Sequence, residues 1–335
     1  MTLTVLCAMN AHAQNHDFLK IAEYGTKAPS GHNTQPWKFK LLDSCIDIYP
    51  NFDYSLPVVD PEDRELYISL GAAAENIAIA ARHFGYSPSI ETEKISEKNC
   101  RIRVVLRKDS AVCDSLFFQI DKRQTNRGVY NGNTIPQDTV EIIKQIRSEE
   151  GVSLHIYRRD EPFFDTLKNY VIKGNEIQME DNSFKEELKS WIRYNGSQAE
   201  ETSDGLTNKV MGSPSVPKIL GKFIIDFFLT PGKQNKSDTA KIMSSSHFVL
   251  FTVKNNNIED WISLGRSLEI FLLKTTELGI ANAYMNQPCE IVSLSRRLAE
   301  SLKTEGEYPA LLLRIGYCAP APYSPRRPVA AAIIK

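Results

Sequence analysis

Ile68-Ser69-Leu70-Gly71, followed by Glu75, recurs with the same spacing as Ile262-Ser263-Leu264-Gly265, followed by Glu269. Each copy lies in an apolar segment that ends at a Phe-Gly or Leu-Gly pair and continues into a strand-like stretch. Such self-similarity points to duplication of one structural unit, here of about 150 to 200 residues. The sequence therefore predicts two related halves that each contain one of two equivalent helices.

The first of these helices is expected to begin at Asp60-Pro61, with Asp60 as N-cap and Pro61 in the first helical position, and to end at Gly85. Before it, a helix is expected at 16–27 and two strands at 37–42 and 45–49, with the loop 28–36 between the helix and the strands. Strands are also expected at 89–93 and 101–107. We expect residues 15–112 to form the first half.

The second half, 113–335, is expected to hold helices near 115–123 and 260–278, another from Ile135-Pro136 to before Gly151, and a strand over 152–157. Between the copies of the repeat, residues 195–238 are rich in Gly, Ser, Pro and Lys and show no clear periodicity. An insertion of this length is usually a lid, a binding loop or a mobile segment. Its apolar run, 219–229, is expected to dock over a pocket.

The composition is that of an ordinary globular protein. The 335 residues are 42% hydrophobic and 24% charged, and 40 basic against 41 acidic residues leave a net charge of -1. This balance favours a small-molecule partner over nucleic acid or a membrane, so a phosphate site would need locally placed arginines. The six cysteines are scattered without a CxxC pair, which argues against a structural metal and favours reduced thiols.

The N-terminus carries a partial signal-peptide pattern. A short apolar run at 3–9 precedes Ala11-His12-Ala13, but no positively charged segment precedes the run. Residues 1–14 are therefore expected to be signal-like or disordered, with a cytoplasmic location expected and export as the alternative. No other segment approaches the roughly 20 apolar residues of a spanning helix.

The loop Pro29-Ser30-Gly31-His32-Asn33-Thr34-Gln35-Pro36-Trp37 resembles the flavin-contacting loop of the nitroreductase family, whose pattern is Pro-Ser-Ser-x-Asn-x-Gln-Pro-Trp. A hydroxyl, backbone N–H groups freed by Gly31 and an amide suit the mixed donor and acceptor edge of an isoalloxazine. Gly31 departs from the family's second serine. Turn chemistry selects the same residue types, so a purely structural loop remains the alternative.

A second motif, Arg123-Gln124-Thr125-Asn126-Arg127 followed by Ile135-Pro136, is similar to the family's opening Arg-x-Ser/Thr-x-Lys/Arg and Ile-Pro helix start. Two arginines beside a hydroxyl can hold a phosphate and place a positive charge by the flavin. A solvated basic face is the alternative. The first copy has no arginine at 18–24, and the second has Glu149-Glu150-Gly151 in place of the loop, which implies one FMN per chain.

Two further stretches extend the resemblance. Ser324-Pro325-Arg326-Arg327-Pro328-Val329 is similar to the family's terminal basic motif, in which Arg326 matches the phosphate position better than Arg327 does. Met285-Asn286-Gln287-Pro288-Cys289 corresponds to the family's loop along the flavin ring. The resemblance thus assigns the cofactor to Pro29, Ser30, Gly31, Asn33, Gln35, Arg123, Thr125, Arg127, Asn286, Gln287, Pro288, Arg326 and Arg327.

The resemblance is closest to the double-length, Acg-type proteins, in which an insertion can cover the flavin. It implies an α+β, nitroreductase-like fold: an internally duplicated pseudo-dimer with central antiparallel-rich sheets flanked by helices. One chain would then suffice as a monomer. The implied function is an FMN-dependent oxidoreductase that passes electrons from NAD(P)H to a nitroaromatic or quinone acceptor.

No catalytic side chain or metal ligand is assigned, since the flavin carries the chemistry. The sequence contains no GxSxG, HExxH or GxxxxGKS motif that would indicate another chemistry. Two alternatives remain. One is a flavin-sequestering protein whose lid allows little turnover, and the other is an interaction protein with a decayed site.

Overall fold

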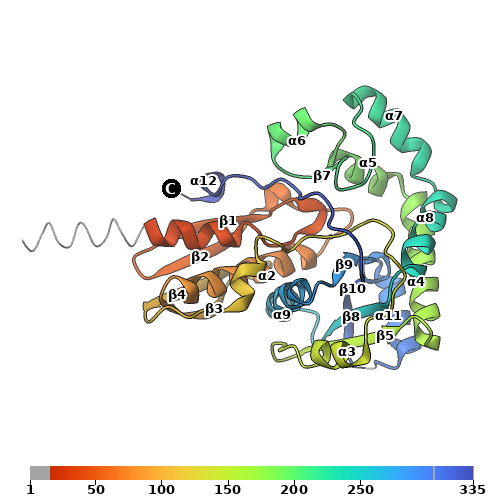
Figure 1. Ribbon diagram of the computed structural model, residues 1–335. Helices are drawn as coiled ribbons and strands as arrows, with labels where there is room; N and C mark the ends of the chain where they lie inside the picture. The colour runs from red at the N-terminus through yellow and green to blue at the C-terminus, as the bar shows by residue number, and fades with distance from the viewer. Residues whose placement is uncertain (1–15, 305, 335) are drawn as a thin grey trace, which may run out of the picture.

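The computed structural model describes residues 16–304 and 306–334, so the expected signal-like segment at 1–14 lies outside the described residues. Residues 16–25 are helical and lead into an antiparallel sheet with strand order β1-β2-β4-β3 (Figure 1). Along β4 every second residue is buried, from Cys100 to Leu106, as expected for a sheet with one face on the core. The strands are β1 (Trp37–Leu41), β2 (Cys45–Pro50), β3 (Tyr86–Ser96) and β4 (Asn99–Lys108).

A second antiparallel sheet has the strand order β5-β8-β10-β9. Every residue of β8 is buried, because its two faces enter different cores. Val249 and Phe251 pack with α9, whereas Phe248 and Leu250 pack with Phe164 of α4. The elements of this part are α3 (Gln137–Lys144), β5 (Val152–Arg158), α4 (Pro162–Glu180), β8 (His247–Val253), α9 (Ile258–Glu277), β9 (Ala281–Tyr284), α10 (Gln287–Glu290), α11 (Val292–Leu302) and β10 (Tyr308–Gly316).

The repeated sequence motif forms the crossing between α2 (Arg64–His83) and α9. A Cβ atom on Gly71 would lie 2.2 Å from the backbone oxygen of Ile262, and one on Gly265 would lie 2.0 Å from that of Ile68. The contact is reciprocal, as at the interface of a two-fold dimer. The expectation of an α+β pseudo-dimer with antiparallel sheets and flanking helices is confirmed.

Two expected helices differ from those observed. Helix α2 begins at Arg64, so Asp60 is not its N-cap, yet the Asp60 carboxylate still accepts the Leu66 backbone N–H at 3.0 Å from the preceding turn. The helix expected at 115–123 is only the short 3-10 helix η3 (Ser115–Gln119). The chain leaves it toward β9, where the Asn126 N–H donates to the Asn282 oxygen at 2.8 Å.

The expected insertion is folded and projects from one side of the molecule (Figure 1). It belongs to a series of short elements: α5 (Asn182–Ser190), β6 (Ile192–Arg193), α6 (Gly196–Thr202), β7 (Leu206–Thr207), α7 (Lys218–Phe228) and α8 (Pro231–Met243). Strands β6 and β7 pair in parallel, and Leu229 joins a small core with Leu56 of the first half. The segment is therefore anchored to both halves.

After β10 the chain crosses back to the first half and ends with α12 (Val329–Ala332), where the Ile334 N–H donates to the Phe39 oxygen at 2.8 Å. This return brings the C-terminal arginines to the short helices η1 (Gly31–Asn33) and η2 (Phe52–Tyr54). Within residues 16–304 and 306–334, no helix has the length and apolar character needed to cross a membrane.

Candidate active site

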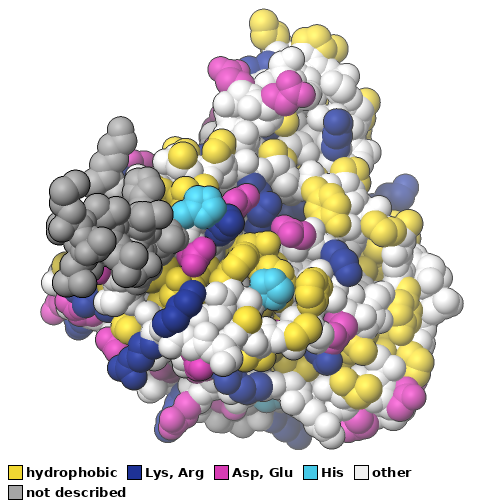
Figure 2. Space-filling model, turned by 60° about the vertical axis from the view of Figure 1, so that its left-hand side comes forward, with side chains coloured by type: hydrophobic (Ala, Val, Ile, Leu, Met, Phe, Trp, Pro, Cys, Tyr) yellow, Lys and Arg dark blue, Asp and Glu magenta, His cyan; other side chains and the backbone are white. Residues whose placement is uncertain are grey.

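A cavity of about 480 Å³ lies where the two halves meet, and this volume is within the usual range for small-molecule sites. Figure 2 shows hydrophobic, basic and acidic side chains together along the hollow of this face. Segments distant in sequence line the cavity together. Of the residues assigned from the sequence, it is lined by Pro29, Ser30, Gly31, Asn33, Arg123, Thr125, Arg127, Asn286, Gln287 and Arg326.

The loop that carries Ser30 has an unusual backbone. His32, Asn33 and Gln35 have φ values of 47°, 58° and 54°, a left-handed conformation that costs energy for residues other than glycine. Ser30 Oγ accepts the Gln35 N–H at 3.0 Å, and the Gln35 amide donates to the Ser203 oxygen at 2.9 Å. Such strain persists where surrounding contacts hold it, and it concentrates at functional sites.

Three arginines gather at one end of the cavity. Arg123 is 5% exposed and donates to the Lys27 oxygen at 2.7 Å, and Arg326 donates to the same oxygen at 3.2 Å and to Asn33 Oδ1. Burial, followed by the charges of Arg123 and Arg127, lowers the pKa of Arg326 to about 9. Burial also lowers the pKa of Arg127. The cations repel one another, so an anion placed among them would be stabilised.

The counter-charge at this end is weak. Arg123 Nε has no hydrogen-bond partner among the described residues, and the Glu269 carboxylate lies 3.4 Å away. Burial raises the pKa of Glu269 to about 7, although Arg123 opposes that shift, so the carboxyl is partly protonated near neutral pH. The charge-assisted bonds that a phosphate accepts are among the strongest available to guanidinium groups.

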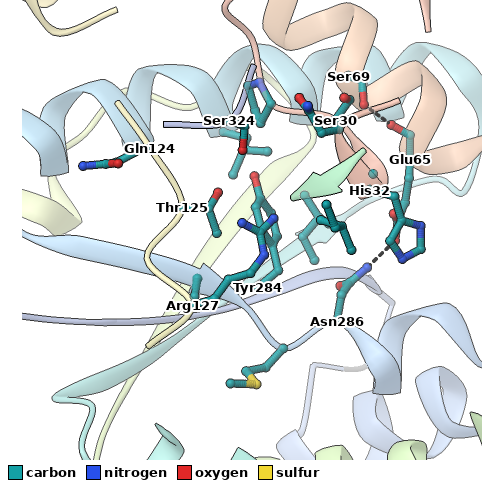
Figure 3. Close-up of a pocket in the computed structure, with 18 of the residues that line it drawn as sticks. Ser30, His32, Glu65, Ser69, Gln124, Thr125, Arg127, Tyr284, Asn286 and Ser324 are labelled. Carbon is teal, nitrogen blue, oxygen red and sulfur yellow. Dashed lines mark hydrogen bonds between the residues drawn. The ribbon is translucent and has the colours of Figure 1, made fainter. Parts of the chain in front are cut away.

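The other end of the cavity is acidic. The Asn286 amide donates to Glu65 Oε1 (Figure 3), and the Gln178 amide donates to Glu290 Oε2. Burial and then the charge of Glu290 raise the pKa of Glu65, and burial raises the pKa of Glu290. Asn286 Oδ1 is already occupied by the Leu312 N–H at 3.1 Å. The Asn286 side chain therefore orients the loop and Glu65.

Figure 3 shows how the two main sequence motifs share one space. Thr125 and Arg127 face Ser30 and His32 across the cavity, and Tyr284 lies between them in this view. Burial and then the positive charge of Arg127 lower the pKa of His32 to about 4, so this imidazole is neutral at physiological pH. His32 therefore adds no fourth cation to the site.

Three residues assigned from the sequence do not line the cavity. Arg327 pairs with Asp204 and lies 3.7 Å over the Tyr54 ring, so it faces away although its neighbour Arg326 faces inward. Gln35 is buried in the loop, where its oxygen accepts the Arg327 N–H at 2.9 Å. Pro288 is buried in α10. These side chains build the wall and do not face the cavity.

Sequence reasoning missed several lining residues. Tyr284 and Glu290 flank the segment already assigned, and Glu65 lies one turn before the repeated motif. Arg314 gave the clearest overlooked signal, because it is a single charge in the apolar strand β10. It is fully buried and donates to the Gly128 oxygen at 2.7 Å and the Asn126 oxygen at 3.2 Å, which positions the backbone on both sides of Arg127.

The insertion contributes to the cavity differently from expectation. Its residues Leu206, Gln234 and Asp238 line the cavity, as does Lys241 just after the insertion, and the Asp238 carboxylate accepts from Asn175 at 3.1 Å and Gln234 at 2.8 Å. The apolar run at 219–229 does not line it. Most of its large side chains face solvent, because Gly221 seats the helix against Tyr194 instead. The expectation that this run docks over the pocket was wrong.

The comparisons with known proteins agree with the resemblance in the motifs. No model of a protein family matches the chain. The chain is 25% identical over 329 residues to "Putative NAD(P)H nitroreductase Rv3131" of Mycobacterium tuberculosis, covering 96% of this chain and 92% of that protein. It is 23% identical to "Putative NAD(P)H nitroreductase acg" of the same organism, covering 93% of this chain and 94% of that protein.

Solved structures match at lower similarity. The FMN-dependent nitroreductase NfnB from Mycobacterium smegmatis in complex with NADPH is 12% identical, with a TM-score of 0.36, and the match covers 61% of this chain and 87% of that one. Iodotyrosine deiodinase bound to FMN and 3-iodo-L-tyrosine is 14% identical, with a TM-score of 0.41 and coverage of 63% and 95%. The relatives matched over nearly their full lengths are named putative NAD(P)H nitroreductases, and this similarity bears out the resemblance to nitroreductase-like proteins of the double-length, Acg type.

Proposed function

We propose that this chain is an FMN-dependent oxidoreductase that takes electrons from NAD(P)H and reduces a nitroaromatic or quinone-type acceptor. One observation carries the proposal: Arg123, Arg127 and Arg326 converge on one end of a cavity between the halves, with a weakly charged glutamate as their nearby counter-ion. The names of the full-length relatives, which call them NAD(P)H nitroreductases, support the donor and the reaction class.

The residues of the cavity fit an FMN. Arg123 and Arg326 would hold the phosphate, since each guanidinium carries more N–H donors than its present contacts use. Ser30 and the backbone around Gly31 would meet the ring edge, together with Thr125. Gln124 and Gln287 also line the cavity, and their buried side-chain oxygens lack a hydrogen-bond partner among the described residues.

FMN would supply the hydride chemistry when bound, so the protein contributes orientation, charge and protons. Arg127 would stabilise the negative charge that grows on the ring during reduction. Burial raises the pKa values of Glu65 and Glu290, so these carboxyls are the candidates to pass a proton to an acceptor that gains negative charge. No Ser-His-Asp arrangement is needed for this reaction.

The first experiment measures the visible spectrum of the purified protein and identifies the compound released on denaturation. A yellow preparation that releases FMN is expected, and a colourless preparation that does not bind added FMN would contradict the proposal. The second experiment adds NADPH or NADH without oxygen and follows the oxidised flavin band. Rapid bleaching, with recovery on addition of a quinone, supports turnover, whereas persistent colour would indicate a protein that holds flavin without using it.

A further inference from the structure

Helix α7 turns a large apolar face toward solvent. Six of its apolar side chains are exposed, among them Ile219 at 76%, Phe223 at 73% and Phe227 at 67%. These three are four residues apart and form one row, and a second row lies beside it. The second row consists of Leu220, Ile224 and Phe228. A contiguous apolar surface of this kind usually marks an interaction site.

The opposite face of α7 is packed onto the protein. A Cβ atom on Gly221 would lie 2.3 Å from the Tyr194 ring, so the helix backbone rests directly on that ring. Leu229 is buried, and Ile225 packs against the core that contains Leu56 and Met179. Figure 1 shows α7 at the outer end of the projecting part of the molecule. The apolar face is thus held outward by a docked helix.

Basic residues outnumber acidic ones around this face. Residues 205–237 contain five lysines and a single acidic residue, Asp226, which pairs with Lys189. The side chains of Lys209, Lys218, Lys222 and Lys236 are exposed and have no ion-pair partner within the part of the chain that the structure describes. Because the whole chain has a net charge of -1, this positive charge is local.

Charge and shape together distinguish the possible occupants. A second copy of the chain placed face to face would bring the lysines of both helices together, which is unfavourable. Closure over the chain's own cavity would require α7 to leave the Tyr194 ring. A convex helix with phenylalanines on one face and lysines beside it is instead typical of helices that lie in a membrane interface.

We propose that α7 binds this protein to the surface of an anionic lipid membrane, with its phenylalanines in the headgroup boundary and its lysines against the lipid phosphates. The helix is about 16 Å long and so lies in the interface, since spanning the hydrocarbon core requires about 30 Å. This inference does not depend on the proposed redox function. It differs from the expectation of no membrane partner, which rested on net charge and the lack of a spanning segment.

The test uses the full chain and measures co-sedimentation with vesicles. Binding is expected to vesicles that contain phosphatidylglycerol and to weaken as salt is added, with much less binding to pure phosphatidylcholine. The double substitution Phe223→Asp with Phe227→Asp should abolish binding. Val112→Asp with Val129→Asp is the matched control at 51% and 63% exposure, and it should bind as the parent protein does.

A second pair of variants tests the charges. Lys218→Gln with Lys222→Gln should weaken binding to the anionic vesicles about fivefold per lysine. The control, Lys20→Gln with Lys40→Gln, removes exposed lysines elsewhere and should change nothing. Equal binding to neutral and anionic vesicles, or no binding to either, would overturn the proposal. The proposal is also overturned if the phenylalanine variant still binds vesicles and instead dissociates a dimer or alters flavin retention.

Discussion

The two copies of the repeated helix carry equivalent glutamates in contrasting surroundings. Glu75 of α2 accepts a hydrogen bond from Arg266 Nε at 3.0 Å, and the same guanidinium donates to Glu149 at 2.8 Å. The Glu269 carboxylate of α9 lies 3.4 Å from Arg123 Nε beside the cavity, and that Nε has no hydrogen-bond partner among the described residues. In the first copy, ion pairs with Arg266 occupy Glu75. In the second copy, Arg123 remains available to a ligand.

This difference gives a physical reason for one site per chain. Glu149 lies in the segment of the second half that stands in place of the Ser30 loop, and Arg266 ties it to Glu75. A guanidinium that already has two carboxylate partners has little net charge to offer a phosphate. Arg123 has a single, partly protonated carboxyl partner, so its charge is largely uncompensated.

The largest effect is expected at the contact that both copies share. Gly265→Ala places a methyl group 2.0 Å from the Ile68 oxygen, and Gly71→Ala places one 2.2 Å from the Ile262 oxygen. Each should lower the free energy of unfolding by about 3 kcal/mol or more, because backbone must move apart. Urea denaturation measures this, with Gly232→Ala as a control in open space. A large change at one glycine and none at the other would contradict the reciprocal crossing.

Arg266→Ala should lower the free energy of unfolding by about 2 to 4 kcal/mol, since it leaves Glu75, which is 3% exposed, without its close partner. The affinity for FMN should remain close to that of the parent protein. Denaturation and flavin titration on the same preparation separate the two effects. Loss of flavin binding at normal stability would mean that the closed copy also holds ligand.

Arg123→Ala and Arg326→Ala should each weaken FMN binding about tenfold or more, because a hydrogen bond to a charged group contributes about 1.5 to 3 kcal/mol. Arg327→Ala is the matched control, since its guanidinium pairs with Asp204 outside the cavity. Fluorescence titration of free FMN gives the dissociation constants. Unchanged affinity in both variants would remove the phosphate assignment.

The smallest effect concerns pH. The Glu269 pKa is raised from 4.5 to about 7 in the folded chain, so its contribution to stability is fully present below about pH 4.5 and is lost as the pH rises through about 7. Glu269→Gln should remove this part of the pH dependence of unfolding, and Glu75→Gln should leave it in place. An identical pH profile for the parent and Glu269→Gln would show that Glu269 does not titrate in that window.

Local sequence patterns were sufficient for the framework. Alternation and turn residues predicted the strands of the first sheet to within a few residues at most ends, and the repeated motif predicted two equivalent helices. The meeting of Ser30 and Thr125 at one cavity also followed from the motifs and the duplication. These features depend on short-range periodicity or on the residue types within a short motif, and both can be recognised in the sequence.

The directions of side chains and their partners far along the chain could not be predicted from local sequence patterns. Arg326 and Arg327 are adjacent and chemically identical, yet one faces the cavity and the other pairs with Asp204, more than 120 residues away. Asp60 matched the pattern of an N-cap but lies one turn before the helix, and the run at 219–229 faces solvent because Gly221 rests on Tyr194. Such choices depend on which distant surfaces pack together and on the burial that results, and this information exists only after the chain has folded.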